Sequence, residues 1–122
     1  MASHMIAIVD DDEDVRGSTG DLLNSLGYDA VAFESAEAFL NSAHAKATTY
    51  LILDQQLPGM QGLELQDRLR AAGAPVAIIF VTAYPNPQGR DRALSGGAVA
   101  YLPKPCDQDA LIQALGSAVP NR

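Results

Sequence analysis

The amino-acid sequence predicts an α/β protein: a doubly wound sheet of five parallel strands with helices on both faces. Five short apolar runs alternate with segments whose apolar residues have helical spacing, which is typical of repeated βαβ units. The runs are rich in β-branched residues and nearly continuous, as expected for parallel strands that are buried on both faces. The 122 residues, of which 48% are hydrophobic, fit one domain with one core.

The first strand is expected at residues 6–9, and the first helix follows it closely. The strand is the run Ile-Ala-Ile-Val, and it ends abruptly in the acidic run 10–14. Acidic residues before and inside the first turn favour the positive end of a helix. Residues spaced along one helix face follow, namely Val15, Thr19, Leu22, Leu23 and Leu26. Gly27 is placed to end this helix as its C′ residue.

The second and third strands are expected at residues 29–33 and 50–53. Between them, Ser35 can cap a helix that runs from residue 36 to about residue 43. The third strand ends directly at Asp54.

The third helix is expected between Gly62 and Gly73, and a fourth strand follows at residues 76–81, closed by Thr82. The next segment, residues 84–89, contains two prolines and a glycine, which are poor helix formers. We therefore expect any fourth helix to be short, and the surface that it forms to be irregular or mobile.

The fifth strand is expected at residues 98–102, followed by Lys104 and a last amphipathic segment. The apolar residues of that segment are Leu111, Ile112, Leu115 and Val119. In folds of this class, ligands bind beyond the carboxyl ends of the strands. The residues that directly follow the strands are therefore the first candidates for a functional site.

Polar side chains follow four of the five predicted strands. Asp10 and Asp11 follow the first strand, and Asp54 follows the third. Thr82 follows the fourth strand and Lys104 the fifth. If these strands are neighbours, the side chains converge, and two carboxylates about 5 Å apart then repel by roughly 3 kcal/mol at an effective dielectric near 20. A divalent cation such as Mg²⁺, which prefers oxygen ligands, removes that penalty.

The same group contains a positive charge and a hydroxyl. Lys104 is suited to an anionic oxygen, and Thr82 can donate a hydrogen bond to another oxygen. A cation, a lysine and a hydroxyl around one carboxylate favour covalent phosphoryl transfer onto that carboxylate. Asp54 is therefore the candidate acceptor.

These motifs occur in a characteristic order along the chain. They are Ile8-Val9-Asp10-Asp11, Asp54 with Leu57-Pro58 and Gly62, Thr82, and Lys104-Pro105. In this order they resemble the CheY-like receiver domain of two-component response regulators, a phosphoprotein module of phosphorelay signal transduction. The resemblance covers residues 5 to about 119, and it implies a flavodoxin-like or CheY-like fold. Residues 35–40 are also similar to receivers that precede a helix-turn-helix output domain.

The resemblance implies a role for each site residue. Asp54 would take a phosphoryl group from a sensor histidine kinase, a phosphotransfer protein or a small donor such as acetyl phosphate. Mg²⁺, or Mn²⁺ as a substitute, would be bound by Asp11 directly and by Asp10 mainly through water. Asp54 and the backbone carbonyl of Gln56 would complete the protein ligands. Lys104 would pair with a phosphoryl oxygen or with Asp54, and its peptide bond to the next proline would be cis.

The resemblance also implies a two-state switch. Thr82 would move to hydrogen-bond the phosphoryl group, and Tyr101 would rotate inward behind it. Gln56 and Tyr84 occupy positions that control water access to the phosphoryl group, and a bulky Tyr84 would slow hydrolysis. The domain would catalyse only its own phosphotransfer and dephosphorylation, without being a conventional enzyme, and would control an output or a partner. The segment 85–115 is a candidate homodimer face.

Composition argues against several other classes of protein. A net charge of −7 disfavours direct nucleic-acid binding by this domain, and no apolar run approaches the ~18 residues of a membrane span. The one cysteine, Cys106, excludes an internal disulfide and fits a reducing cytoplasm. Residues 1–4 are expected to be an expression scar, residues 5–119 the receiver domain, and residues 120–122 a tail or the start of a linker.

Other hypotheses remain open at this point. A strand followed by Asp-x-Asp also occurs in haloacid-dehalogenase-type phosphatases, with Asp10 as nucleophile and Asp12 as acid, but the chain is short and lacks their later acidic motif. Asp10, Asp12, Asp14 and Asp21 have EF-hand spacing, although Val15 replaces the required glycine. The acidic run can also be a solvated helix N-terminus. A last alternative is an interaction module of the same fold without phosphotransfer.

Overall fold

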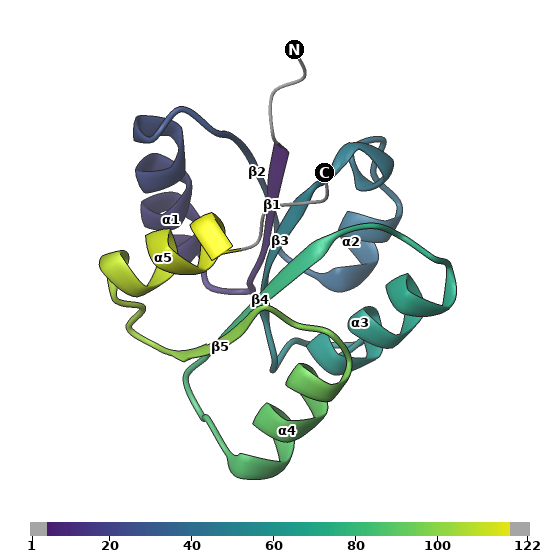
Figure 1. Cartoon of the computed structure of the whole chain (residues 1–122). Coiled ribbons are helices and arrows are strands. Elements are labelled where there is room, and N and C mark those ends of the chain that lie inside the picture. The colour runs from purple at the N-terminus through teal and green to yellow at the C-terminus, as the bar shows by residue number, and fades with distance from the viewer. Residues whose placement is uncertain (1–4, 118–122) are drawn as a thin grey trace.

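A computed structural model describes residues 5–117, and it shows a parallel sheet between two layers of helices (Figure 1). Helices α1 (Glu13–Ser25) and α5 (Gln108–Ser117) cover one face of the sheet. Helices α2 (Ala36–Leu40), α3 (Gly62–Ala71) and α4 (Pro87–Ser95) cover the other face. The fold prediction is confirmed. The expected scar and tail, and Val119 in the last amphipathic segment, lie outside the described residues.

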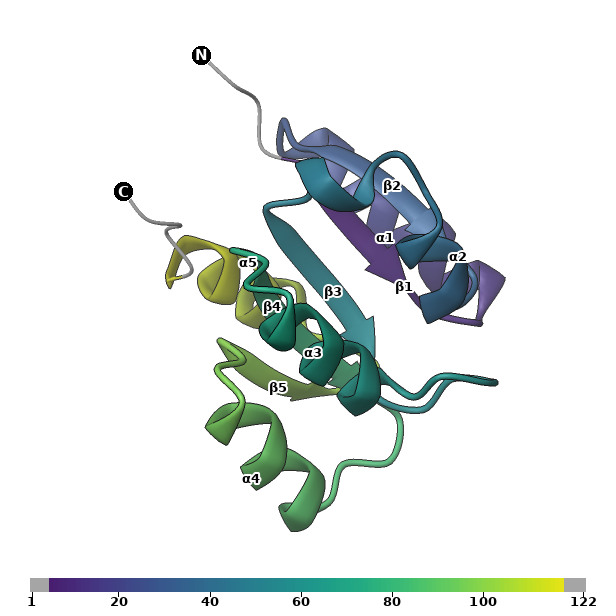
Figure 2. The same ribbon diagram turned by 90° about the vertical axis from the view of Figure 1, so that its right-hand side faces the viewer.

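The five strands are all parallel, in the order β2-β1-β3-β4-β5. They are β1 (Met5–Val9), β2 (Asp29–Phe33), β3 (Tyr50–Asp54), β4 (Ala77–Thr82) and β5 (Ala100–Pro103). The chain runs from β1 outward to β2, then returns past β1 to β3, so the direction of winding reverses between β1 and β3. The arrowheads of β1, β3 and β5 point to the same edge of the sheet (Figure 2). Such a reversal leaves a crevice at the carboxyl ends of the two central strands.

The first helix begins and ends at the residues that the sequence indicated. The Asp12 carboxylate accepts hydrogen bonds from the backbone N–H groups of Asp14 and Val15, which makes Asp12 the N-cap of α1. Gly27, with a φ of 92°, follows the C-cap Leu26 and takes the left-handed conformation that ends many helices.

Helix α2 is shorter than predicted. It ends at Leu40, whereas the sequence predicted an end at about Ala43. The helix ends early because the Ser42 side chain offers the backbone a competing set of hydrogen bonds. The Ser42 hydroxyl donates to the Phe39 carbonyl at 2.8 Å and accepts from the His44 N–H at 3.2 Å. The chain then continues as a short 3₁₀ helix, η1 (Ala45–Ala47).

Helix α4 is short, as predicted, but the predicted irregularity is wrong. Pro87 occupies the first helical position, where the missing N–H has no partner to lose and the fixed φ suits a helix. The Asn86 side chain caps the helix by accepting from the Gly89 N–H at 2.7 Å. Pro87 therefore starts this helix, which is regular over its nine residues.

The fifth strand begins at Ala100, two residues later than predicted. The residues before it, 97 and 98, end helix α4 instead of continuing the strand. Gly97 has a φ of 100°, and the Ala98 N–H donates to the Ala93 carbonyl at 3.0 Å, which closes the last turn.

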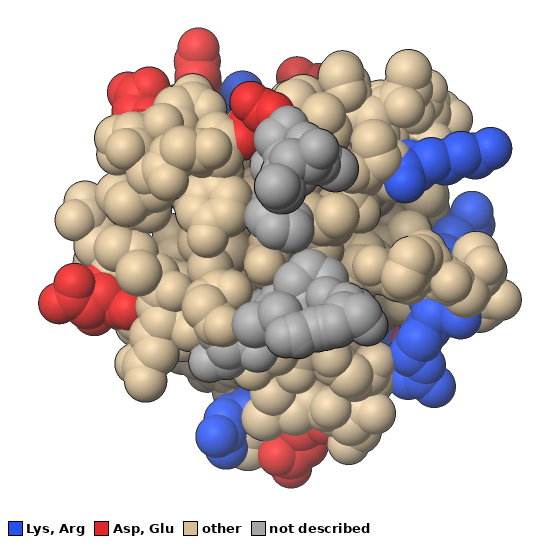
Figure 3. Space-filling view, turned by 45° about the horizontal axis from the view of Figure 1, so that its top comes forward, with Lys and Arg blue, Asp and Glu red and all other residues tan. Residues whose placement is uncertain are grey.

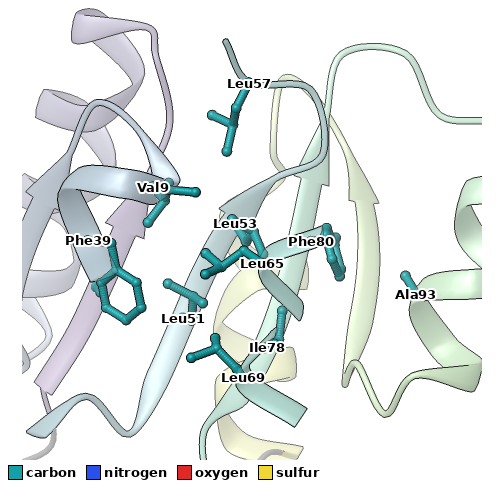
Figure 4. Packing of buried hydrophobic residues seen from close by; sticks show 12 residues of the cluster. Val9, Phe39, Leu51, Leu53, Leu57, Leu65, Leu69, Ile78, Phe80 and Ala93 are labelled. Atoms are coloured by element: carbon teal, nitrogen blue, oxygen red, sulfur yellow. The ribbon is translucent and has the colours of Figure 1, made fainter. Parts of the chain in front are cut away.

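Two apolar clusters hold the layers together, one on each face of the sheet. Figure 4 shows the cluster under α2 and α3, in which Phe39 lies beside Val9 and Leu51 of the sheet and Leu65 lies beside Leu53. The opposite cluster includes Leu23 of α1 and residues of α5. Because both faces are packed, the strand ends stand on a rigid base. Among residues 5–117, no helix is long and apolar enough to cross a membrane.

The surface charge is unevenly distributed. In the view of Figure 3, most basic side chains lie on the side of α2 and α3, and acidic side chains lie mainly at the top and the left. The net charge of −7 is therefore not spread evenly over the surface seen in this view.

Candidate functional site

The strand order brings the predicted site residues to one edge of the sheet. Strands β1, β3, β4 and β5 are consecutive neighbours, which is the condition on which the sequence argument depended. Asp54 is the last residue of β3 and pairs in register with Val81, and Thr82 is the last residue of β4. Asp10 directly follows β1.

Three carboxylates gather at this edge. Asp10, Asp11 and Asp54 each offer an oxygen, and these atoms all lie within 4.8 Å of one another. Asp10 and Asp54 are only 3% and 6% exposed, whereas Asp11 is exposed. Oxygen donors in this number fit a hard divalent cation, and one exposed ligand leaves room for the waters that Mg²⁺ retains.

Lys104 bridges the two buried carboxylates. Its Nζ lies 2.7 Å from Asp10 Oδ2 and 3.1 Å from Asp54 Oδ2. Its backbone N–H donates to the Thr82 carbonyl at 2.8 Å, and the Lys104–Pro105 peptide bond is cis, as the resemblance implied. The shorter contact is to Asp10, a partner that the sequence analysis did not assign to this lysine.

The buried position changes the acidity of Asp54 and Lys104. Burial raises the pKa of Asp54, and the negative charge of Asp10 adds to the effect, while hydrogen bonds from Lys104 and the Gln56 N–H oppose it. For Lys104, burial lowers the pKa, but the hydrogen bonds with Asp10 and Asp54 outweigh it and the pKa is raised. The lysine is therefore protonated at neutral pH. Because one lysine faces three carboxylates, a further positive charge at the site would be stabilising.

The second oxygen of each buried carboxylate is held by the backbone. Asp10 Oδ1 accepts from the Asp12 N–H at 2.9 Å, and Asp54 Oδ1 accepts from the Gln56 N–H at 3.1 Å. Arg16 Nη1 donates to the Asp10 carbonyl at 2.9 Å. Sequence reasoning missed Arg16, although it is the one basic residue close after the acidic run. The two backbone N–H donors orient the carboxylates, and the Arg16 bond holds the Asp10 backbone.

An open cleft of about 560 Å³ lies in front of Asp54. Gln56 and Tyr84 both line it, and Tyr84 is 69% exposed at its rim. Thr82 is fully buried, and its Oγ1 accepts from the Tyr84 N–H at 3.1 Å. The cleft leaves the Asp54 carboxylate open to an incoming group, and Ala83, the residue after the buried Thr82, is part of its lining.

Comparison with known proteins decides the family. The sequence model of the response regulator receiver domain matches residues 6–116. The chain belongs to this family. Phosphorylation is the standard function of receiver domains in two-component systems.

Curated relatives of this receiver domain are response regulators. Nodulation protein W of Bradyrhizobium diazoefficiens is 37% identical over 114 residues, which are 93% of this chain and 50% of that protein. Response regulator protein TodT of Pseudomonas putida is 34% identical over 115 residues, covering 94% and 51%. Transcriptional regulatory protein FixJ of Bradyrhizobium diazoefficiens is 32% identical over 114 residues, covering 93% and 56%. The chain therefore spans about half the length of these relatives.

Solved structures share the fold of this receiver domain. The response regulator StyR has a TM-score of 0.87 and 35% sequence identity, over 97% of this chain and 60% of that chain. The structure FixJ-N has a TM-score of 0.84 and 32% identity, over 97% and 94%. Both structures are more than 30% identical to this chain in sequence, so the structural comparison agrees with the sequence comparison on the family.

Tyr101 lies away from the carboxylates of the receiver site. Its hydroxyl donates to Gln55 Oε1 and accepts from the Asn86 N–H at 3.3 Å. Gln55 was not predicted as a site residue. Its place after Asp54 carries no signal, because only the tertiary structure brings it against Tyr101.

The acidic run is divided between two tasks. Asp10 and Asp11 belong to the site, whereas Asp12 caps α1, as the helix N-terminus hypothesis predicted. The EF-hand hypothesis is wrong, because α1 begins at Glu13 and carries Asp14 and Asp21 along the helix, where no ion-binding loop can form.

Proposed function

We propose that this receiver domain accepts a phosphoryl group on Asp54 with Mg²⁺ bound beside it. The observation that carries the proposal is the position of the Asp54 carboxylate. It meets the oxygens of Asp10 and Asp11 within 4.8 Å and Lys104 Nζ at 3.1 Å, and it faces an open cleft. Burial raises the pKa of Asp54, and Lys104 is its partner. Positive charge around the incoming phosphoryl oxygens would favour the reaction of this carboxylate with a phosphoryl donor.

Asp11, Asp10, Asp54 and the backbone carbonyl of Gln56 would hold the cation. The donor set supports this, because all four ligands are hard oxygens and the exposed Asp11 can bind directly while waters complete the shell. Mn²⁺ would substitute, since it accepts the same carboxylate, carbonyl and water ligands. When bound, the ion supplies positive charge that the phosphoryl oxygens need.

In the transfer step, an Asp54 carboxylate oxygen forms a bond to phosphorus. The bond from phosphorus to the donor breaks at the same time, and the leaving group, a histidine imidazole or acetate, keeps the electron pair. Lys104 would exchange its contact with Asp54 for a phosphoryl oxygen while it stays on Asp10, its shorter contact at 2.7 Å.

The switch would follow from Thr82. Its hydroxyl would turn from the Tyr84 N–H, now 3.1 Å away, toward a phosphoryl oxygen. Tyr101 of β5 would then rotate inward. Its movement would change the surface formed by the segment 85–115, which is the candidate homodimer face. Gln56 and Tyr84, which line the cleft, would set how fast water reaches the phosphoryl group.

We also infer the place of this domain in a signalling pathway. A sensor histidine kinase or a phosphotransfer protein would supply the phosphoryl group in the cytoplasm. Relatives named as transcriptional regulatory proteins are matched over only 50–56% of their length, which supports a transcriptional output outside the receiver domain. DNA contact would then belong to that output, since the receiver itself has a net charge of −7.

The test is intact-mass analysis after incubation with acetyl phosphate and Mg²⁺. The unaltered protein should gain the mass of one phosphate, and Asp54→Ala should gain none. Asp12→Ala is the matched control, because Asp12 is a neighbouring acid that caps α1, and it should still gain the phosphate.

Two outcomes would contradict the proposal. A phosphate that persists in Asp54→Ala and disappears in Asp10→Ala would favour Asp10 as the nucleophile, as in the dehalogenase-type alternative. A protein that gains no phosphate and binds no Mg²⁺ would be an interaction module with the receiver fold.

A further inference from the structure

The loop between β3 and α3 carries part of the proposed magnesium site. The Gln56 N–H donates to Asp54 Oδ1 at 3.1 Å, and the Gln56 carbonyl is one of the proposed ligands. The two ends of the loop are fixed to each other, because the Gln55 carbonyl accepts from the Gly62 N–H at 2.9 Å. A Cβ on Gly62 would lie 2.9 Å from Gln55 Cα, so the two backbones are in direct contact. The position of the Gln56 backbone therefore depends on how the rest of the loop is held.

Side chains within the loop hold its inner part. Leu57 is only 4% exposed and belongs to the apolar cluster under α2 and α3. Gln61 Nε2 donates to the Leu57 carbonyl at 2.7 Å, and the Gln61 N–H donates to Glu64 Oε1 at 3.0 Å in the capping box of α3. Residues 58 and 59, in contrast, are exposed. This outer part of the loop is therefore where a contact from another element matters most.

Glu37 of α2 supplies that contact. Its Oε2 accepts from the Met60 N–H at 2.8 Å, which joins two segments that are 23 residues apart. The Met60 N–H holds the pKa of Glu37 below its ordinary value, so the carboxylate is ionised at neutral pH and is a strong acceptor. Gly59 leaves room for the carboxylate, since a Cβ there would lie 2.5 Å from Glu37 Oε2. Helix α2 is itself fixed to the core by Phe39, which is only 1% exposed.

From these contacts we infer that Glu37 is a positioning residue for the metal site. It acts through the loop, because the bond to Met60 restricts residues 56–60 to the conformation in which the Gln56 N–H orients Asp54. Without this acceptor, the Met60 N–H would bond to water, and the loop would gain alternative conformations. A site that is complete in fewer molecules binds its ion more weakly. This role depends on the proposed binding of Mg²⁺ beside Asp54.

The first experiment measures the tie itself in metal-free protein. Amide hydrogen exchange followed by NMR reports on the Met60 N–H, which should be protected in the unaltered chain. In Glu37→Met its exchange should rise several-fold, because the acceptor is lost. Glu37→Gln keeps an acceptor oxygen and should restore most of the protection. Glu34→Met is the matched control, since Glu34 is an exposed acid just before α2, and it should leave Met60 protected.

The second experiment measures Mg²⁺ affinity at constant ionic strength. MgCl₂ is added to metal-free protein, and the NMR signal of the Gln56 amide reports the dissociation constant. That constant should rise several-fold in Glu37→Met, whereas it should stay close to the unaltered value in Glu37→Gln and Glu34→Met. Rescue by glutamine separates positioning from a loss of negative charge, because both substitutions at residue 37 remove the charge. Urea denaturation at the same pH checks that the variants are folded to the same extent.

A raised exchange of Met60 in Glu37→Met with an unchanged Mg²⁺ dissociation constant would overturn the inference. So would a Met60 N–H that is unprotected in the unaltered chain, or a Glu37→Gln variant that binds Mg²⁺ as weakly as Glu37→Met. Should Glu37→Met fail to fold, Gly59→Ala takes its place, because its methyl group would displace the Glu37 carboxylate. Its control is Gly27→Ala, at a φ of 92° against 74° for Gly59 and with no atom within 4 Å of the new methyl. An unaltered chain that binds no Mg²⁺ refutes the proposed function, whereas the tie between Glu37 and Met60 is judged by the exchange alone.

Discussion

The body of the sheet and its carboxyl-end rim are stabilised in different ways. In the body, Leu53, Leu65 and Phe80 are fully buried among apolar neighbours. At the rim, Asp10 and Asp54 are almost as buried, yet they carry charge and depend on one lysine. The body gains from burial alone, whereas the rim loses from burial unless a cation compensates. A change of charge therefore alters the free energy of the folded chain more at the rim than in the body of the sheet.

The contact between α4 and the sheet resembles the rim more than the body. Its buried residues are the small Gly89 and Ala93, while α3 buries Leu65 and Leu69. A polar contact also attaches α4 to the neighbouring α3, because Gln66 Nε2 of α3, a residue only 2% exposed, donates to the Ala93 carbonyl at 2.9 Å. A helix held by a few hydrogen bonds can shift at lower cost than one held by large apolar side chains.

The largest effect is expected in the body of the sheet. Leu65→Ala should lower the free energy of unfolding by about 2–5 kcal/mol, because it leaves a cavity between α3 and the sheet. Urea denaturation measures the loss. Leu94→Ala, on the exposed side of α4, is the matched control and should cost less than about 1 kcal/mol, because its side chain is already 37% exposed. Equal losses would show that α3 and α4 are anchored alike.

A smaller effect is expected when the rim loses its lysine. Lys104→Met should lower the free energy of unfolding by about 1–3 kcal/mol in the absence of divalent cations, because two buried carboxylates then lack their partner. Mg²⁺ should stabilise the variant more than the unaltered protein, since the ion takes over the missing charge. Thermal unfolding with and without MgCl₂ measures both. Lys46→Met, at an exposed lysine, should change neither, and an equal response to Mg²⁺ in Lys104→Met would refute this account.

The smallest effect is a gain in stability. The pKa of Asp54 is raised in the folded chain, chiefly by burial, so the folded state binds this proton more tightly than the unfolded state. Ionised Asp54 therefore costs stability at neutral pH, and the cost disappears as pH falls through the folded pKa. Without Mg²⁺, Asp54→Asn should be modestly more stable at neutral pH, and the advantage should shrink as pH falls and vanish once the residue 54 carboxylate is protonated in both the folded and the unfolded state.

Urea denaturation across this pH range checks the prediction. Asp21→Asn, at an exposed carboxylate on α1, is the control and should show no such trend. An advantage of Asp54→Asn that grows toward low pH would mean that the sign of the linkage is wrong.

Particular elements show how far the sequence alone could go. The first strand, the Asp12 cap and Gly27 follow from local rules, since each depends on neighbours in the chain. The end of α2 was missed because Ser42 competes for backbone groups. The regularity of α4 was missed because a proline weakens a helix interior but favours its first position, and the pattern did not fix which position Pro87 would take.

The sequence by itself determined the order of strands and helices along the chain. It also determined which acids, which hydroxyl and which lysine follow the strands, because strand ends and their polar residues are local features. The tertiary structure decided the closer pairing of Lys104 with Asp10, and the meeting of Gln55 with Tyr101. These contacts join side chains from different strands and loops. Their geometry depends on how closely backbones approach at Gly62 and Gly89, which no pattern along one segment records.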